Sequence, residues 1–310
     1  MRLVMMNGGL GNQLFQYIFM RYIEEKSGEA CVIEDLYFCG DETVHNGYEI
    51  ERIFGLKHTR LSDLLDADVI AEMRRILSTN GPDGKPESIL TVFKSCGIDL
   101  FPVQEGNFYR DVASYSGSIF STPANEFYPD ILRCEGDLYY YGYWINAGWM
   151  AGIIGTILNE LTFPPLPDAR NQAFVSQIES AGANSVAVHV RRGDFANLGW
   201  LLPTDYYVRS VAGVREQVEK PMFFFFSDDI PWVKKHLPDL GILPTDEVVF
   251  VEGNMGGNNY IDMQLMSKCR GMVIANSSFS YLAALLNTRP DKMVWKPGEK
   301  RQILYYKERT

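Results

Sequence analysis

The segment VAVHVRRGD, residues 186–194, places two adjacent arginines and an aspartate after an apolar run that predicts a buried parallel strand. In an open α/β sheet, ligands bind outside the carboxyl ends of the strands. A guanidinium group is always charged and can hold a phosphate through two parallel hydrogen bonds. We therefore expect a phosphorylated ligand at this position.

Side chains alternate along a strand, so His189 and Arg191 share one face and Arg192 points to the other. Burying Arg191 on a sheet face without an anion would be costly, which makes it the candidate phosphate ligand. For Arg192 the structural alternative is an ion pair with Asp194 that braces the loop.

Two aspartates, Asp228 and Asp229, follow the run MFFFFS at the end of another predicted strand. Paired carboxylates suit a divalent metal ion or the N–H groups of a base or sugar. Either residue could instead be the N-cap of the predicted helix IPWVKKHL. We expect one of them to cap the helix and the other to be available to the ligand.

A third polar segment, NSSFS, joins a predicted strand to a predicted helix. Backbone N–H groups at a helix start, together with three hydroxyls, would form a cradle for a diphosphate. An ordinary serine N-cap needs only one of the hydroxyls, but the arginine-bearing strand end in the same sheet favours the cradle. Its residues are Asn276, Ser277, Ser278, Phe279 and Ser280.

The N-terminal segment NGGLGNQ, residues 7–13, also lies between a predicted strand and helix, with Gly9, Asn12 and Gln13 as candidate ligand-binding residues. It matches neither G-x-G-x-x-G nor a P-loop, so a tight turn that needs glycine only for its geometry is the alternative. The D-x-D triplet at 66–68 lies in the polar helical stretch LSDLLDADVIAEMRRIL, which we interpret as a solvated helix face rather than a metal–nucleotide site.

Strand and helix patterns alternate from residue 168 onward, and this alternation indicates a doubly wound parallel sheet. Thr204 is the expected N-cap of the helix TDYYVRSVAGVREQV. The predicted strands are SVAVHV, MFFFFSD, EVVFVEG, GMVIAN and KMVWKP. The first half begins similarly, with strand RLVMM, a helix that ends near Gly28 and strand CVIED, but the order of elements in 56–134 is not readable. FPPLPD at 163–168 is the predicted linker, which divides the chain into units 1–162 and 163–310.

Composition narrows the classes of partner. Apolar residues make up 46% and charged residues 22% of the 310 residues, as in globular proteins. The net charge of −10 argues against nucleic acid as the main partner. No apolar run could span a bilayer and the N-terminus lacks a signal peptide's apolar core, which predicts a cytoplasmic protein and leaves peripheral membrane association open. The five cysteines have no metal or disulfide spacing and are expected to be reduced.

Taken in order, GGLGNQLFQY, HVRRGDF, FSDDIPW and DMQLMSKCRGMVIANSSFSYLAALLN resemble the α-1,2-fucosyltransferase family. GYEIERIF at 47–54 and YYGYW at 140–144 are similar to that family's acceptor-side half. His-x-Arg-Arg clusters also occur in α-1,6- and protein O-fucosyltransferases. The family usually has two tryptophans after the serine motif, where this chain has Tyr281 and Leu282. The membrane anchor of animal members is absent, which favours a bacterial-type enzyme.

The resemblance implies a GT-B-like fold of two Rossmann-type doubly wound domains facing a cleft, with 1–162 on the acceptor side and 163–310 binding GDP-fucose. It implies inverting transfer of L-fucose from GDP-fucose to the 2-hydroxyl of a terminal β-galactoside in an oligosaccharide or glycan, without a metal. A fucosyltransferase of other linkage, α-1,6 or protein O-linked, is one alternative. A non-catalytic nucleotide-sugar or glycan-binding module is the other, and it would be expected to lose Arg191 or the serine cradle.

The resemblance also implies roles for individual residues. Arg191 would bind the β-phosphate and stabilise the leaving group, while Ser277, Ser278 and Phe279 donate to the same diphosphate.

His189 and Asp228 or Asp229 would position guanosine, and Asn12 would reach across the cleft. A general base should accept the proton of the galactose 2-hydroxyl. Asp194 is the candidate for that role because the motif places it near the cleft.

Overall fold

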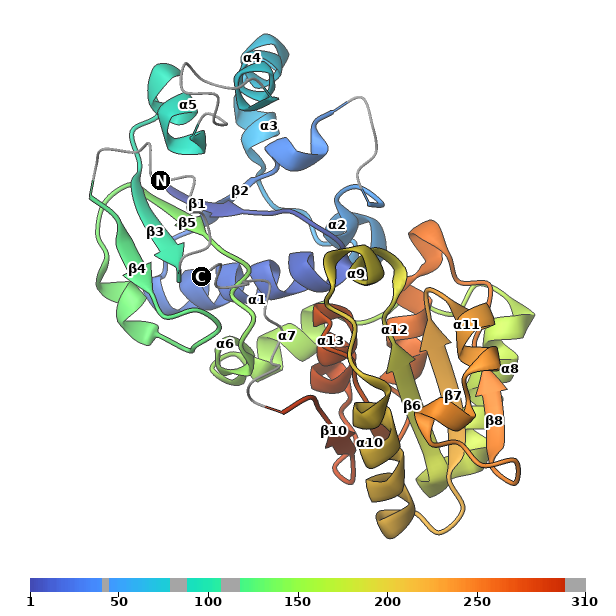
Figure 1. Ribbon diagram of the computed structural model, residues 1–310. Coiled ribbons are helices and arrows are strands. Elements are labelled where there is room, and N and C mark those ends of the chain that lie inside the picture. Colours follow the sequence, from blue (N-terminus) through green and yellow to red (C-terminus); the bar gives the residue numbers. More distant parts are fainter. Residues whose placement is uncertain (41–44, 79–87, 107–117, 299–310) are drawn as a thin grey trace. The chain divides into compact units, whose positions relative to one another are not determined.

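The computed structural model describes residues 1–40, 45–78, 88–106 and 118–298. The chain divides into two compact units, Met1–Thr162 and Phe163–Thr310, and the division falls at the start of FPPLPD. Among the described residues, each unit contains one five-stranded sheet whose strand pairs are all parallel (Figure 1). The fold class is therefore α/β with two doubly wound parallel sheets, as predicted, whereas the roles assigned to the two units stay predictions.

The C-terminal sheet has the strand order β10-β9-β6-β7-β8. Counted along this unit and read from β8, the order is 3-2-1-4-5, which matches the first five strands of the classic Rossmann order 3-2-1-4-5-6. The chain moves outward from β6 to β8 and then returns to β9, so the topological switch point lies between β6 and β9. The strands are β6 (Ser185–Val190), β7 (Met222–Ser227), β8 (Glu247–Phe250), β9 (Gly271–Val273) and β10 (Met293–Trp295).

Helices cover this sheet on both faces (Figure 1), and one of them, α9, was not predicted from the sequence. Pro203, rather than the expected Thr204, stands at the N-cap of α10, because Thr204 is already helical. The helices are α8 (Ala169–Ala181), α9 (Gly193–Leu198), α10 (Thr204–Gln217), α11 (Ile230–Lys235), α12 (Tyr260–Met266) and α13 (Ser278–Leu286), with short 3-10 turns at Gly182–Asn184, Pro238–Leu240 and Gly256–Asn258.

The four phenylalanines of β7 are buried on both faces of the sheet, as predicted. Strand β7 pairs with β6 along its whole length, from Ser185 opposite Met222 to Val190 opposite Ser227. Phe223 and Phe225 belong to the apolar cluster that α10 covers, and side chains alternate along a strand. Their two neighbours therefore point to the opposite face, where they are also buried.

The N-terminal sheet has a different strand order, β2-β1-β5-β3-β4. Strand β5, the last in sequence, inserts between β1 and β3, and this long-range pairing is why local patterns could not order the middle of the unit. Its strands are β1 (Arg2–Met5), β2 (Cys31–Glu34), β3 (Phe101–Glu105), β4 (Phe120–Thr122) and β5 (Leu138–Tyr141).

Helices lie on both faces of the N-terminal sheet as well, with α1 on one side and α4 and α5 on the other (Figure 1). Helix α1 ends at Gly28 (φ 73°), as predicted. The stretch LSDLLDADVIAEMRRIL is two helices rather than one, and Asp66 and Asp68 are exposed, as expected for a solvated face. The helices are α1 (Leu10–Ser27), α2 (Glu49–Phe54), α3 (Leu61–Leu64), α4 (Ala67–Ser78), α5 (Ile89–Ser95), α6 (Ala147–Ala151) and α7 (Ile154–Glu160), with 3-10 turns η1 (Leu36–Phe38) and η3 (Pro129–Arg133).

Two further expectations concern the chain as a whole. All five cysteines are unbridged, in agreement with reduced thiols. Across the described ranges, the helices are too short or too polar for any of them to cross a membrane.

Glu34, the last residue of β2, makes the stability of the fold depend on pH. It is buried, and its carboxylate accepts hydrogen bonds from Leu36 N–H (2.9 Å) and Tyr139 O–H (3.0 Å). Burial raises its pKa from 4.5 to about 7, so the folded protein holds a proton that the unfolded chain releases. The stability that this proton contributes is present below pH 4.5 and is lost as the pH rises toward 7.

We expect Glu34→Gln to remove this pH dependence, because the amide keeps an acceptor for Leu36 N–H and cannot ionise. The wild-type free energy of unfolding should fall relative to that of the variant by up to ~1.4 kcal/mol per pH unit in this window. Urea unfolding of both proteins across the window measures the difference, and parallel curves would contradict the assignment.

Candidate functional site at the carboxyl edge of the C-terminal sheet

The three polar segments found in the sequence follow three neighbouring strands of the C-terminal sheet. Arg191 follows β6, Asp228 follows β7, and the NSSFS segment connects β9 to α13. Because the strands are parallel, these segments lie at the same edge of the sheet, next to the switch point between β6 and β9. Such a position is where open α/β sheets bind their ligands.

Arg191 is held by two carboxylates. Its Nη2 lies 2.5 Å from Asp194 Oδ1, and its Nη1 lies 2.8 Å from Asp228 Oδ2. The guanidinium carbon is also 5.2 Å from the centre of the Phe195 ring. Asp194 therefore pairs with Arg191 and not with Arg192, because the turn after β6 brings residues 191 and 194 together. A phosphate that binds Arg191 must share the guanidinium group with these carboxylates or displace one of them.

Arg192 has a bracing role in this arrangement. Its Nε lies 3.2 Å from Asp229 Oδ2, and its guanidinium carbon lies 3.8 Å from the centre of the Trp232 ring. A stacked cation of this kind is worth about 0.5–1 kcal/mol where it is exposed and more where it is desolvated. The predicted ion pair of Arg192 with Asp194 is therefore wrong, because Arg192 pairs with Asp229 instead; a direct contact of Arg192 with the ligand stays a prediction.

The two aspartates after β7 are both engaged. Asp229 Oδ1 accepts the backbone N–H of Trp232 at 3.1 Å and caps α11, which confirms that one of the pair is an N-cap. Asp228 Oδ1 accepts the backbone N–H of Arg192 at 2.8 Å, in addition to the ion pair with Arg191. The expectation that the second aspartate is free for the ligand is therefore wrong, because Asp228 ties β7 to the turn after β6.

Two buried polar atoms at the switch point lack a partner within the described part of the chain. One is Nδ1 of His189, in β6, and the other is Oδ1 of Asn276, after β9. Asn276 Nδ2 donates to Trp200 O at 2.8 Å, which aims its side chain. A buried polar atom without a hydrogen bond costs roughly 1–3 kcal/mol, so a polar ligand that supplies partners would be stabilised here.

His189 is uncharged in the folded protein. Burial, and to a smaller extent the charge of Arg191, lower its pKa to about 3. Its ring packs near that of Phe279, with the ring centres 5.9 Å apart. A neutral imidazole has one donor and one acceptor nitrogen, so His189 can position a ligand through a hydrogen bond but offers it no positive charge.

Two hydroxyl groups of the NSSFS segment accept hydrogen bonds from backbone N–H groups of their own turn. Ser277 is the N-cap of α13, and its Oγ accepts the N–H of Phe279 at 3.3 Å. Ser280 is completely buried, and its Oγ accepts the N–H of Ala275 at 3.2 Å. The hydroxyl of Ser280 is thus used inside the turn, and a contact of this residue with the ligand stays a prediction. For Ser277, Ser278 and Phe279 the diphosphate contact stays a prediction.

The glycine turn of the N-terminal unit is built around Gln13. This side chain is completely buried: its Nε2 donates to Gly8 O and Gly47 O, both at 2.9 Å, and its Oε1 accepts Glu49 N–H at 2.8 Å. Gln13 thus holds the turn to the segment before α2, and its contact with a ligand stays a prediction. Gly9 is the N-cap of α1, and its contact with a ligand stays a prediction.

Gly8 and Asn12 show why the turn needs glycine. Gly8 has φ +74°, and a Cβ there would lie 2.7 Å from Asn12 Nδ2. This geometry agrees with the turn interpretation and leaves the ligand contact of Asn12 as a prediction.

Sequence reasoning missed two residues that shape this edge of the N-terminal sheet. Gln16 accepts Asn7 N–H at 3.0 Å and donates to Gly142 O at 3.1 Å, which joins the ends of β1 and β5. Glu105, at the end of β3, accepts three backbone N–H groups from two loops. The donors are Asn125, Tyr143 and Trp144, at 3.1, 2.9 and 2.7 Å. Neither residue belongs to a recognisable local motif, so no signal in the sequence identifies them.

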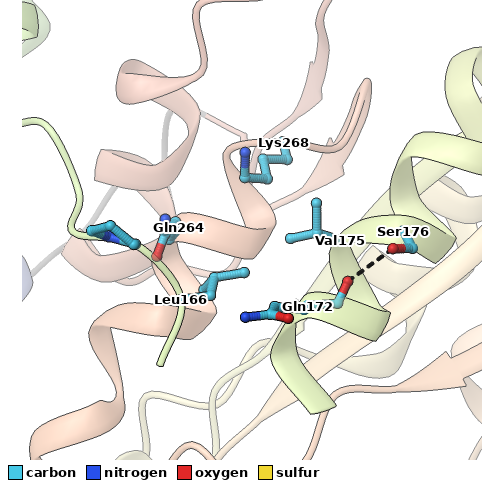
Figure 2. Close-up of a pocket in the computed structure, with 7 residues that line it drawn as sticks. Leu166, Gln172, Val175, Ser176, Gln264 and Lys268 are labelled. Atoms are coloured by element: carbon cyan, nitrogen blue, oxygen red, sulfur yellow. Dashed lines mark hydrogen bonds between the residues drawn. The ribbon is translucent and has the colours of Figure 1, made fainter. Parts of the chain in front are cut away.

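A pocket of about 420 Å³ lies elsewhere in the C-terminal unit, between α8 and α12. Figure 2 shows Leu166 between side chains of the two helices, with Ser176 Oγ donating to Gln172 O (3.1 Å) on α8. The pocket contains none of the strand-end residues described above, and we do not assign the candidate site to it. Its lining residues are Pro165, Leu166, Gln172, Val175, Ser176, Gln264 and Lys268.

Comparisons with known proteins show the family of the chain. The sequence model of glycosyl transferase family 11 matches residues 2–296 of this chain. The O-antigen biosynthesis glycosyltransferase WbnK of Escherichia coli is 24% identical over 306 residues, which cover 94% of this chain and 92% of WbnK. An α-1,2-colitosyltransferase of Escherichia coli is 28% identical over 286 residues, covering 90% and 85% of the two chains. The mouse galactoside 2-α-L-fucosyltransferase Sec1 is 27% identical over 139 residues, covering 42% and 37%. Since the family match spans almost the whole sequence, the chain belongs to glycosyl transferase family 11.

Proposed function

We propose that this glycosyltransferase moves L-fucose from GDP-fucose to the 2-hydroxyl of a terminal β-galactoside, with inversion at the anomeric carbon. The observation that carries the proposal is that Arg191 and two unpartnered atoms, His189 Nδ1 and Asn276 Oδ1, all belong to the carboxyl ends of the neighbouring strands β6 and β9, at the switch point. One cationic group and two hydrogen-bonding groups suit a nucleoside diphosphate. The α-1,2 relatives named above support the linkage.

In this proposal Arg191 stabilises the departing diphosphate. When the bond between fucose and the β-phosphate breaks, negative charge develops on the phosphate oxygens. A guanidinium group held ready for that charge lowers the barrier without reorganising. Asp228 keeps Arg191 oriented at the edge of the sheet, and the diphosphate takes the place of Asp194 on the guanidinium.

GDP-colitose is a second candidate donor, because the colitosyltransferase matches most of this chain. Colitose is fucose without its 3-hydroxyl. A site that hydrogen-bonds this hydroxyl would reject the deoxy sugar by about 10⁴- to 10⁵-fold, whereas an apolar pocket would discriminate weakly.

Transfer assays with both donors test the proposal. Purified protein is incubated with GDP-fucose or GDP-colitose and with lactose, methyl β-galactoside or methyl β-glucoside, and the linkage is determined by NMR. We expect an α-1,2-linked product on the galactosides only, unchanged by EDTA. Another linkage, or binding of GDP-fucose without turnover, would overturn the assignment. Activity lost in EDTA and restored by Mn²⁺ would overturn the role of Arg191.

Gly193→Ala tests whether Asp228 holds the diphosphate site. A Cβ at Gly193 would lie 2.5 Å from Asp228 Oδ2, so the carboxylate must move away from Arg191 and from the turn after β6. We expect GDP affinity to fall roughly tenfold, the effect of losing one charged hydrogen bond. Gly298→Ala is the control, since nothing lies within 4 Å of a Cβ there. Calorimetric titration with GDP measures both, and equal affinities would contradict the role of Asp228.

A further inference from the structure

Tyr37 presents an exposed aromatic ring just after the carboxyl end of β2. It belongs to the turn η1, and 37% of its surface is exposed. Strand β2 pairs in parallel with β1, with Glu34 opposite Met5. The ring therefore lies at the same sheet edge as the glycine turn that follows β1, and this edge is where ligands of α/β sheets bind.

The backbone under Tyr37 is held firmly. Asp35 is buried, and its carboxylate accepts hydrogen bonds from the N–H (3.1 Å) and O–H (2.5 Å) of Ser62, while its carbonyl accepts Phe38 N–H at 2.9 Å. The Tyr37 ring packs edge-on against Phe38, with centres 5.2 Å apart and planes at 86°. An aromatic group fixed in this way loses little conformational freedom when a ligand covers it.

His45 connects Tyr37 to the glycine turn. Its ring centre is 6.3 Å from that of Tyr37, and its Nδ1 would be 3.7 Å from a Cβ at Gly9. His45 is exposed. Tyr37, His45 and Gly9 thus form one surface, the Tyr37 shelf, which combines a flat apolar ring, a polar imidazole and the half-buried backbone of Gly9.

We propose that the Tyr37 shelf binds the sugar ring of the galactoside acceptor. One face of a β-galactopyranose consists of C–H groups and is apolar, whereas its hydroxyls point outward. Tyr37 offers that face a flat aromatic contact, and the imidazole of His45 offers the hydroxyls a hydrogen bond. This inference rests on the proposed function and adds to it a binding site for the acceptor within the N-terminal unit.

Tyr37→Ala tests the shelf through the acceptor. We expect KM for lactose, and Kd for lactose in an NMR saturation-transfer titration, to rise roughly tenfold. KM for GDP-fucose and kcat should stay within about twofold. Tyr37→Trp should retain lactose binding, because it keeps the flat ring. Phe101→Ala is the matched control. Phe101 is 39% exposed, but it is the first residue of β3 and therefore lies at the amino-terminal ends of the strands of the same sheet, opposite to Tyr37.

Unchanged lactose affinity in a folded Tyr37→Ala protein would overturn the inference, as would a rise in KM for GDP-fucose alone or an equal effect of Phe101→Ala. The titration does not require turnover. If the wild type binds lactose through Tyr37 but transfers no sugar, the proposed function fails and the shelf stands. If it transfers fucose and Tyr37→Ala has no effect, the shelf fails alone.

Discussion

Arg191→Ala should lower kcat/KM for transfer by about 10²- to 10³-fold, the typical effect of removing a preorganised donor to developing charge. The structure adds a second reason for a large loss. Arg191 is shared by Asp194 and Asp228, so its removal leaves two carboxylates that repel the diphosphate.

Arg192→Lys is the matched control and should cause a small loss. Arg192 pairs with Asp229 and lies over Trp232, and lysine retains the charge while losing the flat stacking contact. Kinetics with GDP-fucose and lactose, together with thermal unfolding of each variant, make the comparison. Equal and mild losses in the two variants would remove Arg191 from the phosphate site.

Asp194→Asn should abolish transfer while GDP binding persists, if Asp194 is the general base. A general base contributes about 10²- to 10⁴-fold, and the loss should appear in kcat, because the amide keeps the shape of the side chain but cannot take a proton. Calorimetric titration with GDP, alongside steady-state kinetics, separates the two effects.

The ion pair between Asp194 and Arg191 suggests a different role, in which Asp194 competes with phosphate for the guanidinium group. If Asp194 only competes with phosphate for the guanidinium, Asp194→Asn should tighten GDP binding and retain turnover, and the base would then be sought among carboxylates of the N-terminal unit. Asp205→Asn is the control for a general effect of lost surface charge, since Asp205 is another exposed carboxylate paired with an arginine, Arg209.

The C-terminal unit could be predicted from the sequence because its signals are local. A run such as MFFFFS can be recognised as a buried strand without knowledge of its neighbours, and the helix that follows it predicts an N-cap at either Asp228 or Asp229. The order of the N-terminal sheet could not be predicted in this way, because the pairing of β5 with β1 joins residues that are far apart in sequence.

The candidate site shows the same division. Three of its segments could be placed together from the sequence, since each lies at the carboxyl end of a strand of one sheet. Their partners could not, because which carboxylate reaches Arg191 depends on the turn after β6 and on the approach of Asp228 from β7. Gln13 shows a related limit: its amide suits a ligand as well as it suits the turn, and only the structure shows the hydrogen bonds by which it holds the turn.

The phenylalanine strand β7 also has a consequence for synthesis of the protein. Its partner β6 and the covering helix α10 precede it in the chain, whereas β8 follows some twenty residues later. As the strand leaves the ribosome, one of its edges is therefore open, and the segment Phe223–Phe226 carries no charge and no proline that would hinder pairing with another chain. Uncharged aromatic segments with an open edge are prone to aggregate, so the yield of active protein from a recombinant host depends on how quickly β8 closes that edge.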